Sequence, residues 1–284
     1  MTKNYISVDV ADKCEDVFAV IVTFNPNIFV LEELLDSLLL QVGRAIIVDN
    51  CSDLDLLAWH KNSRHANLTI KKLDANYGIA YAQNIGIREA RRMAAKFILL
   101  SDQDSKPAQN MVYCLKKAAV KLAASGKKVA AVGPRFMDAR QNNPSPFTKI
   151  KGLTVKRQCE STLIDVVETD HLIASGCLIP IQVIDVVGLM NEDMFIDYVD
   201  IEWSLRAKNF GFQSFGVFSA AMNHNLGDDH VDFFGKRVTL HSPLRHYYMM
   251  RNGIWMYKQK HIPAAWKLVD AYRLILRACF YVIF

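Results

Sequence analysis

Two aspartates one residue apart, Asp102 and Asp104, follow the apolar residues 97–100. A short apolar run of this kind is typical of a buried strand, and residues i and i+2 of an extended backbone point to the same side. The two carboxylates therefore converge at a strand end, where hard oxygen ligands suit a divalent cation beside a phosphate. The alternative is structural: the pair could open a turn and cap a helix that begins at Pro107.

The strand before this pair belongs to a regular alternation of strands and helices. Strands are expected at residues 17–24, 45–48, 68–73, 97–102 and 128–132. Helices are expected at residues 31–38, 54–65, 79–95 and 107–126. This alternation predicts an α/β fold built on a doubly wound, mostly parallel sheet. A polar loop is expected at 138–160, followed by strands at 163–167, 172–179 and 212–218 and by helices at 180–189 and 200–209.

Composition limits the class of protein. The chain has 284 residues, of which 51% are hydrophobic and 22% charged, and this describes a globular protein with one large domain and an appendage. A net charge of +5, without a basic run interleaved with aromatic residues, argues against nucleic acid as a partner. The six cysteines form no Cys-x-x-Cys pair and the N-terminus has no secretory signal pattern, so we expect a cytoplasmic protein.

Polar turns follow four strands of the first half. They are Thr23-Phe24-Asn25, Asp49-Asn50, Asn76-Tyr77-Gly78 and Asp102-Gln103-Asp104. In a doubly wound sheet such turns gather along one edge and form a nucleotide cleft, where an Asp can accept a hydrogen bond from a base imide or a ribose hydroxyl. Glycines such as Gly78 allow close backbone approach. Alternatively, Asn76, Gly78, Asn84 and Gly86 could serve helix entry and packing.

These ordered motifs resemble glycosyltransferase family 2, whose members have the GT-A fold. The matching segments are Ile21-Val22-Thr23-Phe24-Asn25, Val48-Asp49-Asn50-Cys51-Ser52, the run from Asn76 to Gly86, and Ser101-Asp102-Gln103-Asp104-Ser105. The resemblance covers roughly residues 17–255, and the Asp-Gln-Asp-Ser form is most similar to bacterial rhamnosyltransferases of O-antigen and related polysaccharides. It implies a nucleotide-sugar donor, a divalent cation (Mg²⁺ or Mn²⁺) and an inverting transfer.

The resemblance also implies roles for individual residues. Thr23, Asn25, Asp49 and Asn76 are expected to face the nucleoside, and Gly78, Asn84, Gln103 and Arg251 to complete the donor site. Asp102 is expected at the ribose or the metal, Asp104 at the metal and diphosphate, and His224 as third metal ligand, with His230 and His241 as competitors. Gln103 stands where much of the family has Asp or Ala, and this form favours a rhamnose donor.

A second acidic cluster, residues 192–206, resembles the family segment that supplies the catalytic base. Asp200 fits best, because Ile201-Glu202-Trp203-Ser204-Leu205-Arg206 matches the helix start that follows the base. An inverting displacement needs a carboxylate that removes the acceptor hydroxyl proton, and an Asp of ordinary pKa, about 3.9, is ionised at neutral pH. Asp197 is the alternative base, and Asp200 could also simply cap its helix.

The C-terminal part combines positive charge with amphipathic helices. A helix expected after Pro243 carries Arg245 and Arg251, which could hold a donor diphosphate or a lipid phosphate; the alternative is a solvated basic face. Residues 262–284 are apolar except for one stripe, Lys267, Asp270, Arg273 and Arg277. A helix with this pattern suits the surface of an anionic membrane leaflet, and the alternative is a helix packed on the domain itself.

The leading prediction is therefore an inverting glycosyltransferase at the cytoplasmic face of the membrane. It would transfer L-rhamnose from dTDP-L-rhamnose to a hydroxyl of a lipid-linked glycan. The alternatives are a family 2 enzyme using a UDP-sugar, and a non-catalytic nucleotide-sugar or glycan-binding module. A nucleotidyltransferase would need a Lys/Arg-rich phosphate loop where Asn25-Pro26-Asn27 stands. We expect an N-terminal extension (1–16), a GT-A domain (17–240, with nucleotide-binding half 17–135 and acceptor half 136–240) and a helical C-terminal segment (241–284).

Overall fold

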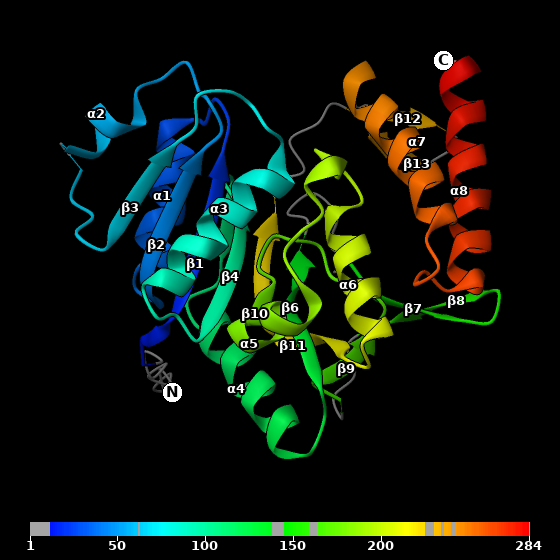
Figure 1. Ribbon diagram of the computed structural model, residues 1–284, viewed down its shortest axis with the longest axis horizontal. Helices are drawn as coiled ribbons and strands as arrows, with labels where there is room; N and C mark the ends of the chain where they lie inside the picture. The colour runs from blue at the N-terminus through cyan, green and yellow to red at the C-terminus, as the bar shows by residue number, and fades with distance from the viewer. Residues whose placement is uncertain are drawn as a thin grey trace, which may run out of the picture.

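The computed structural model describes residues 12–61, 63–137, 145–159, 164–224, 230–233, 236–239 and 242–283. Its first half is a run of parallel strands joined by helices (Figure 1). The strands are β1 (Cys14–Thr23), β2 (Val42–Asp49), β3 (Leu68–Lys72) and β4 (Phe97–Asp102). The helices between them are α1 (Ile28–Leu38), α2 (Leu56–Lys61) and α3 (Ile79–Arg92). β1 lies between β2 and β4 and is parallel to both, which places the ends of all three strands at one edge.

The second half extends this sheet with strands of mixed direction. Its elements are β5 (Ser105–Pro107), α4 (Met111–Ala124), β6 (Val129–Met137), β9 (Val166–Thr169), β10 (Leu178–Pro180), α5 (Ile181–Val187), a 3₁₀ turn η1 (Glu192–Met194), α6 (Val199–Asn209) and β11 (Gln213–His224). In the described part of the chain the sheet has nine strands, ordered β3-β2-β1-β4-β10-β6-β11-β5 with β9 beside β11. β10 is antiparallel to both of its neighbours, whereas β11 is parallel to β6.

Apolar side chains cover both faces of the sheet, as the doubly wound prediction requires. On one face α1 contributes Leu31, Leu34, Leu35 and Leu38, spaced at helical intervals, and α4 packs beside it. On the other face α3, α5 and α6 enclose a second core that includes Trp203. The α/β fold predicted from the alternation is therefore present, and it holds the polar strand ends rigidly from both sides.

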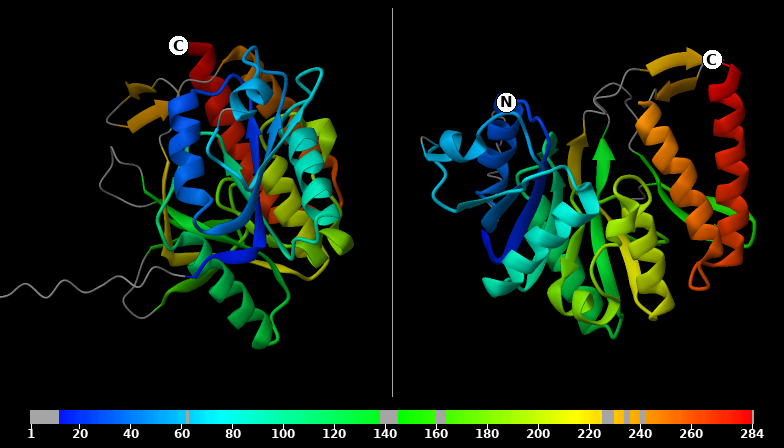
Figure 2. Two further views of the ribbon diagram at one scale, coloured as in Figure 1. Left: turned by 90° about the vertical axis from the view of Figure 1, so that its left-hand side faces the viewer. Right: turned by 45° about the horizontal axis from the view of Figure 1, so that its top comes forward.

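Two hairpins and two long helices complete the structure. The hairpins are β7 (Phe147–Lys151) with β8 (Thr154–Gln158), and β12 (His230–Phe233) with β13 (Lys236–Thr239). The helices are α7 (Pro243–Lys258) and α8 (Ala264–Ile283), which lie side by side at the end of the sheet farthest from β3 (Figures 1 and 2). No helix in the described residues is long and apolar enough to cross a membrane.

Several elements differ from those expected. Pro107 does not begin a helix: it ends β5, pairs with Met222 of β11, and lies on the last strand of the sheet, where a residue without an N–H is tolerated. The loop expected at 138–160 contains the β7–β8 hairpin, which turns at Gly152 with a φ of 61°. The strand expected at 172–179 is only β10, because Gly176, with a φ of 74°, interrupts the extended backbone. β1 begins at Cys14, within the predicted N-terminal extension.

Candidate active site

Thr23 and Asp49 lie opposite each other where β1 and β2 end. Both are fully buried, and the Thr23 hydroxyl donates a 3.3 Å hydrogen bond to Asp49 Oδ1. Ser52 also donates to Oδ1 through its backbone N–H and its hydroxyl. The second oxygen, Asp49 Oδ2, is buried without a partner among the described residues. A buried carboxylate oxygen is costly without a donor, so this position fits an N–H or O–H from a ligand.

The turns after these strands are tied to each other through asparagine side chains. Asn25 accepts from the N–H of Asp53 through Oδ1 at 2.9 Å, and its own N–H donates to Ser52 Oγ at 2.9 Å. Asn76 Oδ1 accepts from Asn50 Nδ2 at 2.7 Å and from the N–H of Gly78 at 3.0 Å. The structure thus brings together the predicted nucleoside-facing turns, and these bonds set their shape.

Gln103 has a structural partner that the sequence did not indicate. Its side-chain amide bonds both polar atoms of the Phe24 backbone, accepting from N–H at 2.9 Å and donating to C=O at 3.3 Å. This two-point contact joins the turn after β4 to the turn after β1. Gln103 therefore fixes the turns at this edge of the sheet, and its contact with the donor stays a prediction.

Two other predicted donor residues contact the segment 190–197. Gly78 has a φ of 86°, and an added Cβ would lie 2.5 Å from the carbonyl oxygen of Phe195. Asn84 is buried and bonds Met190 N, Met190 O and Glu192 Oε1 at 2.8–2.9 Å. This matches the alternative left open by the sequence, in which both residues serve helix entry and packing.

Arg251 braces the same segment from α7. It donates to the carbonyl oxygen of Asp193 and to Asn252 Oδ1, and its guanidinium lies 4.6 Å from the centre of the Tyr248 ring. It does not line the main cavity described below. That Arg251 binds the donor stays a prediction.

Asp102 and Asp104 lie at the end of β4 and in the turn that follows it. The N–H of Asp102 donates to Ser175 Oγ at 3.3 Å, and Ser105 also hydrogen-bonds Ser175, so the turn is anchored from two sides. Asp104 is half-buried and has no hydrogen bond or ion pair to any described residue. Two carboxylates on one anchored turn, one of them unpaired, fit a divalent cation.

The proposed third metal ligand is only partly described. The backbone of His224 ends β11 and pairs with Ser105, next to Asp104 in the chain, whereas its side chain lies outside the described residues. His230 belongs to β12 and its side chain is also outside them, as is the whole of His241. Among the described residues, no three His, Cys, Asp or Glu side chains gather as a metal site.

A cavity of about 580 Å³ begins at Asp102 and extends to α8. Asp200, near the start of α6, lines it together with Asp102, and the backbone N–H groups of Ala174 (3.2 Å) and Ile201 (2.8 Å) donate to its carboxylate. Burial raises the pKa of Asp200 to about 6, and the nearby Asp102 carboxylate adds to the rise. A carboxylate with a pKa close to neutral is well matched to accept a proton.

Asp197 lies on the same cavity but already has a partner. Arg245 of α7 donates to both of its oxygens, from Nη2 at 2.9 Å and from Nε at 3.3 Å. Both carboxylate oxygens of Asp197 are therefore occupied by the guanidinium and are less accessible to an acceptor hydroxyl. The geometry therefore favours Asp200 over Asp197.

The segment before Asp200 has an unusual backbone. Phe195, Asp197 and Tyr198 all have φ near 60°, a region that L-residues other than glycine rarely occupy. The buried side chain of Asn252 on α7 holds it by donating to the carbonyls of Met194, Ile196 and Asp197 at 2.8–2.9 Å. Sequence analysis assigned Asn252 no role of its own, although its place next to Arg251 on the helix expected after Pro243 was a weak signal.

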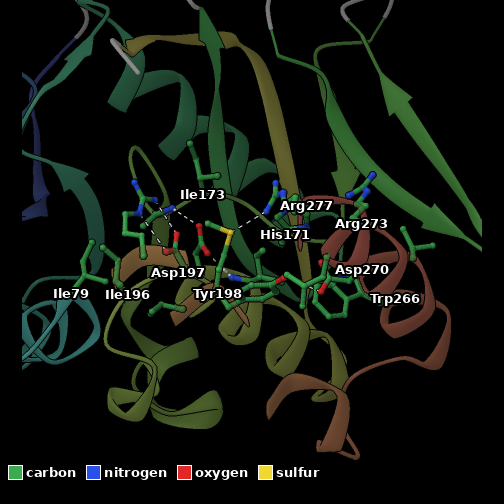
Figure 3. A pocket seen from close by; sticks show the side chains of 18 of the residues that line it. Ile79, His171, Ile173, Ile196, Asp197, Tyr198, Trp266, Asp270, Arg273 and Arg277 are labelled. Atoms are coloured by element: carbon green, nitrogen blue, oxygen red, sulfur yellow. Dashed lines mark hydrogen bonds and ion pairs between the residues drawn. The ribbon is translucent and has the colours of Figure 1, made fainter. Parts of the chain in front are cut away.

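The polar stripe predicted on α8 is present, but most of it faces the protein. Asp270, Arg273 and Arg277 line the far end of the cavity (Figure 3), whereas Trp266 and Leu274 are buried beside them. Asp270 Oδ2 accepts from the hydroxyls of Tyr198 (2.9 Å) and Tyr257 (2.8 Å). The opposite side of α8 is apolar and exposed: Leu268 (61%), Tyr272 (65%), Ile275 (62%) and Leu276 (52%).

Comparison with known proteins supports this description. Residues 18–174 match the model of "Glycosyl transferase family 2". The chain is 33% identical over 249 residues to the dTDP-rhamnosyl transferase RfbF of Shigella flexneri, covering 87% of this chain and 82% of that protein. The family resemblance read from the motifs is thereby confirmed.

Solved structures agree in fold. GalNAc-T7 with UDP, GalNAc and Mn²⁺ superposes with a TM-score of 0.61 at 12% identity, covering 90% of this chain and 53% of that one, so this chain spans about half its length. Residues 1–349 of S. aureus TarS in complex with UDP-GlcNAc give 0.53 at 14% identity, covering 88% and 69%. The expected GT-A fold is confirmed.

Proposed function

The chain belongs to glycosyltransferase family 2, and on this premise we propose that it transfers L-rhamnose from dTDP-L-rhamnose to a hydroxyl of a lipid-linked glycan. The observation that carries the chemistry is the pair Asp102 and Asp200, which line one cavity, with Asp200 tuned to accept a proton. The identity to a dTDP-rhamnosyl transferase over most of the chain supports the choice of donor.

In this proposal the strand-end turns bind the nucleoside. Asp49 Oδ2 accepts a hydrogen bond from the imide of the base or from a ribose hydroxyl, which satisfies its buried oxygen. Thr23 orients that carboxylate, and Asn25 and Asn76 form the surrounding walls. Gln103 and Gly78 act indirectly, by fixing the turns that the donor touches.

In this proposal the reaction centre lies between the carboxylates of Asp102 and Asp200. Asp102 and Asp104, with His224, would hold Mg²⁺ or Mn²⁺, which offsets the charge of the departing diphosphate. Asp200 takes the proton of the acceptor hydroxyl while the oxygen of that hydroxyl forms a bond to the anomeric carbon. The attack comes from the face opposite the breaking bond to the diphosphate. The products are dTDP and a glycoside of inverted configuration.

The proposed location is the inner face of the cytoplasmic membrane. The exposed apolar side of α8 suits the headgroup boundary of a bilayer, and from Arg245 onward the chain has seven Lys or Arg and one acid, Asp270. An acceptor anchored in that bilayer could then enter the cavity beside α8. The domain boundaries expected at residues 16/17, 135/136 and 240/241 stay a prediction.

A panel of dTDP-, UDP- and GDP-sugars, incubated with purified protein, a glycan acceptor and Mg²⁺ or Mn²⁺, tests the proposal. Consumption of dTDP-L-rhamnose alone, with a product of inverted anomeric configuration by NMR, is the expected result. Turnover of a UDP-sugar instead supports the first alternative from the sequence. Tight binding of a nucleotide sugar with no turnover under any condition supports a non-catalytic module and contradicts the proposal.

A further inference from the structure

The end of the cavity that lies against α8 carries cationic groups with little to neutralise them. Arg273 makes no hydrogen bond or ion pair with any described residue, and Arg277 bonds only the sulfur of Met249, at 3.3 Å. A thioether is a weak acceptor for a guanidinium, which prefers the paired oxygens of a carboxylate or phosphate. In Figure 3, Arg273 and Arg277 lie near His171 in the right-hand part of the pocket, whereas Ile79 and Ile196 lie at its left.

The other charged groups at this end do not remove the need for an anion. Asp270 faces both arginines, but the hydroxyls of Tyr198 and Tyr257 already occupy one of its oxygens. Burial lowers the pKa of His171, so it adds no positive charge at neutral pH, and its buried Nδ1 has no partner among the described residues. Unsatisfied polar groups that converge on a cavity wall are characteristic of a ligand site.

The arginines of α7 differ in this respect. Arg245 is paired with Asp197, and Arg251 is bound to a carbonyl oxygen and lies outside the cavity. The sequence offered these two as candidate phosphate contacts, whereas the described structure leaves the arginines of α8 available. They belong to α8, whereas Asp102, where the donor diphosphate belongs in the proposed function, ends β4.

We propose that Arg273 and Arg277 form a subsite for a phosphate group of the acceptor, at the α8 end of the cavity. The inference rests on the proposed glycosyl transfer and deepens it, because it names the chemistry that selects the acceptor. Each planar guanidinium can donate two parallel hydrogen bonds to phosphate oxygens. Both arginines and Asp200 line this cavity, so a glycan carried by a phosphate bound there can extend towards the base.

Binding measured by calorimetry, without donor sugar, tests the subsite separately from the transfer reaction. The probes are octyl diphosphate, inorganic pyrophosphate and, as a neutral reference, octyl glucoside. EDTA is present so that no cation at Asp102 and Asp104 can hold the probes. We expect Arg273→Gln and Arg277→Gln each to weaken binding of octyl diphosphate by about tenfold, the size expected for a lost charge-assisted hydrogen bond.

Lys267→Gln is the matched control, since Lys267 belongs to the same stripe but donates to the carbonyl of Gln259 and does not line the cavity. It should bind octyl diphosphate as the unaltered protein does. Arg277→Lys keeps the charge without the planar fork, so it should give an intermediate affinity. Thermal unfolding of each variant shows whether the fold is kept; both arginines are exposed enough for this to be expected.

The outcomes test the phosphate subsite separately from the proposed rhamnose transfer. Equal affinity for pyrophosphate and octyl diphosphate supports recognition of the phosphate alone, and tighter binding of octyl diphosphate supports a phosphate carried on a lipid. Unchanged binding in both Gln variants, or an equal loss for octyl glucoside, overturns the subsite. If rhamnose transfer fails while the arginine-dependent binding persists, the donor assignment is wrong and the subsite stands.

Discussion

The hydroxyl of Tyr198 donates a 2.9 Å hydrogen bond to Asp270, which connects α8 directly to the segment that positions Asp200. Tyr198 caps the start of α6 in a left-handed conformation, and its ring packs edge-on against Trp266 of α8. The C-terminal helix is therefore part of the cavity wall and supports the proposed base. Removing residues from Pro263 onward would open that cavity and would also remove any membrane contact that α8 makes.

This connection predicts that Tyr198→Phe lowers kcat for transfer, by about fivefold to tenfold, while donor affinity stays the same. The physical reason is the loss of one hydrogen bond, worth about 1 kcal/mol, at a backbone turn that already has an uncommon conformation. Steady-state kinetics and donor titration would measure both quantities. Tyr257→Phe is the matched control, because Tyr257 donates to the same Asp270 oxygen from α7 and is not part of the turn. An equal fall in kcat for both variants would contradict the positioning role.

Asp200 should set the acidic limb of the pH profile. Its pKa is raised to about 6, and only the ionised form can take a proton, so log kcat/KM should fall with unit slope below about pH 6 and level off above it. Initial rates between pH 5 and 8 at saturating metal would show this limb. In Asp200→Asn the limb should vanish together with about 99% of the activity, since a proton acceptor typically contributes a hundredfold or more.

The same substitution should make the protein more stable near neutral pH. A carboxylate whose folded pKa lies above its unfolded value costs stability above the folded pKa, and this cost disappears below the unfolded one. The free energy of unfolding of Asp200→Asn, measured in urea, should therefore exceed that of the unaltered protein by about 1 kcal/mol at pH 8. At pH 3.5 the two values should be equal. Asp197→Asn, which breaks the ion pair with Arg245, should lose stability at pH 8 instead. Full transfer by Asp200→Asn and none by Asp197→Asn would identify Asp197 as the base.

Removal of divalent metal should abolish transfer. EDTA should reduce the rate to background, and added Mn²⁺ or Mg²⁺ should restore it, because the cation offsets the charge that develops on the diphosphate. Asp104→Ala should lower activity at least a hundredfold and weaken Mn²⁺ binding measured by electron paramagnetic resonance. Its thermal stability should be unchanged, since Asp104 has no described partner to lose. Undiminished turnover of the unaltered protein in EDTA would refute a metal-dependent mechanism.

Motifs with strong local signals could be predicted from the sequence. The strand ends at Thr23, Asp49 and Asp102 follow apolar runs whose burial needs no tertiary information, and parallel pairing then brings them together. The base candidate Asp200 was found because the family motif and the helix start coincide. The doubly wound sheet could be predicted from the alternation of strand and helix patterns along the sequence.

Contacts between distant segments could not be predicted in this way. Asn84 and Gln103 are polar residues near the motifs, and only the tertiary structure shows that their amides bond Met190 and the Phe24 backbone. For α8 the periodicity predicts a polar stripe correctly, but periodicity has no information on which side faces the protein. The stripe faces inward because Asp270 finds two tyrosine hydroxyls and because Trp266 and Leu274 fill the adjoining core.

Because the polar stripe of α8 faces the protein, the apolar side of this helix is exposed. Leu268 and Ile275 lie two helical turns apart and point away from the cavity, so their replacement by Glu should spare the fold. If this side inserts at a membrane surface, Leu268→Glu/Ile275→Glu should lose most co-sedimentation with anionic vesicles at low salt, because a carboxylate is repelled by the headgroups and excluded from the apolar boundary. Val120→Glu on α4, another exposed apolar position, is the matched control and should sediment like the unaltered protein. Transfer to a lipid-linked acceptor in vesicles should fall with sedimentation in the double variant, whereas transfer to a water-soluble acceptor should change less than twofold. Equal sedimentation of the double variant and the control would show that α8 does not carry the membrane contact.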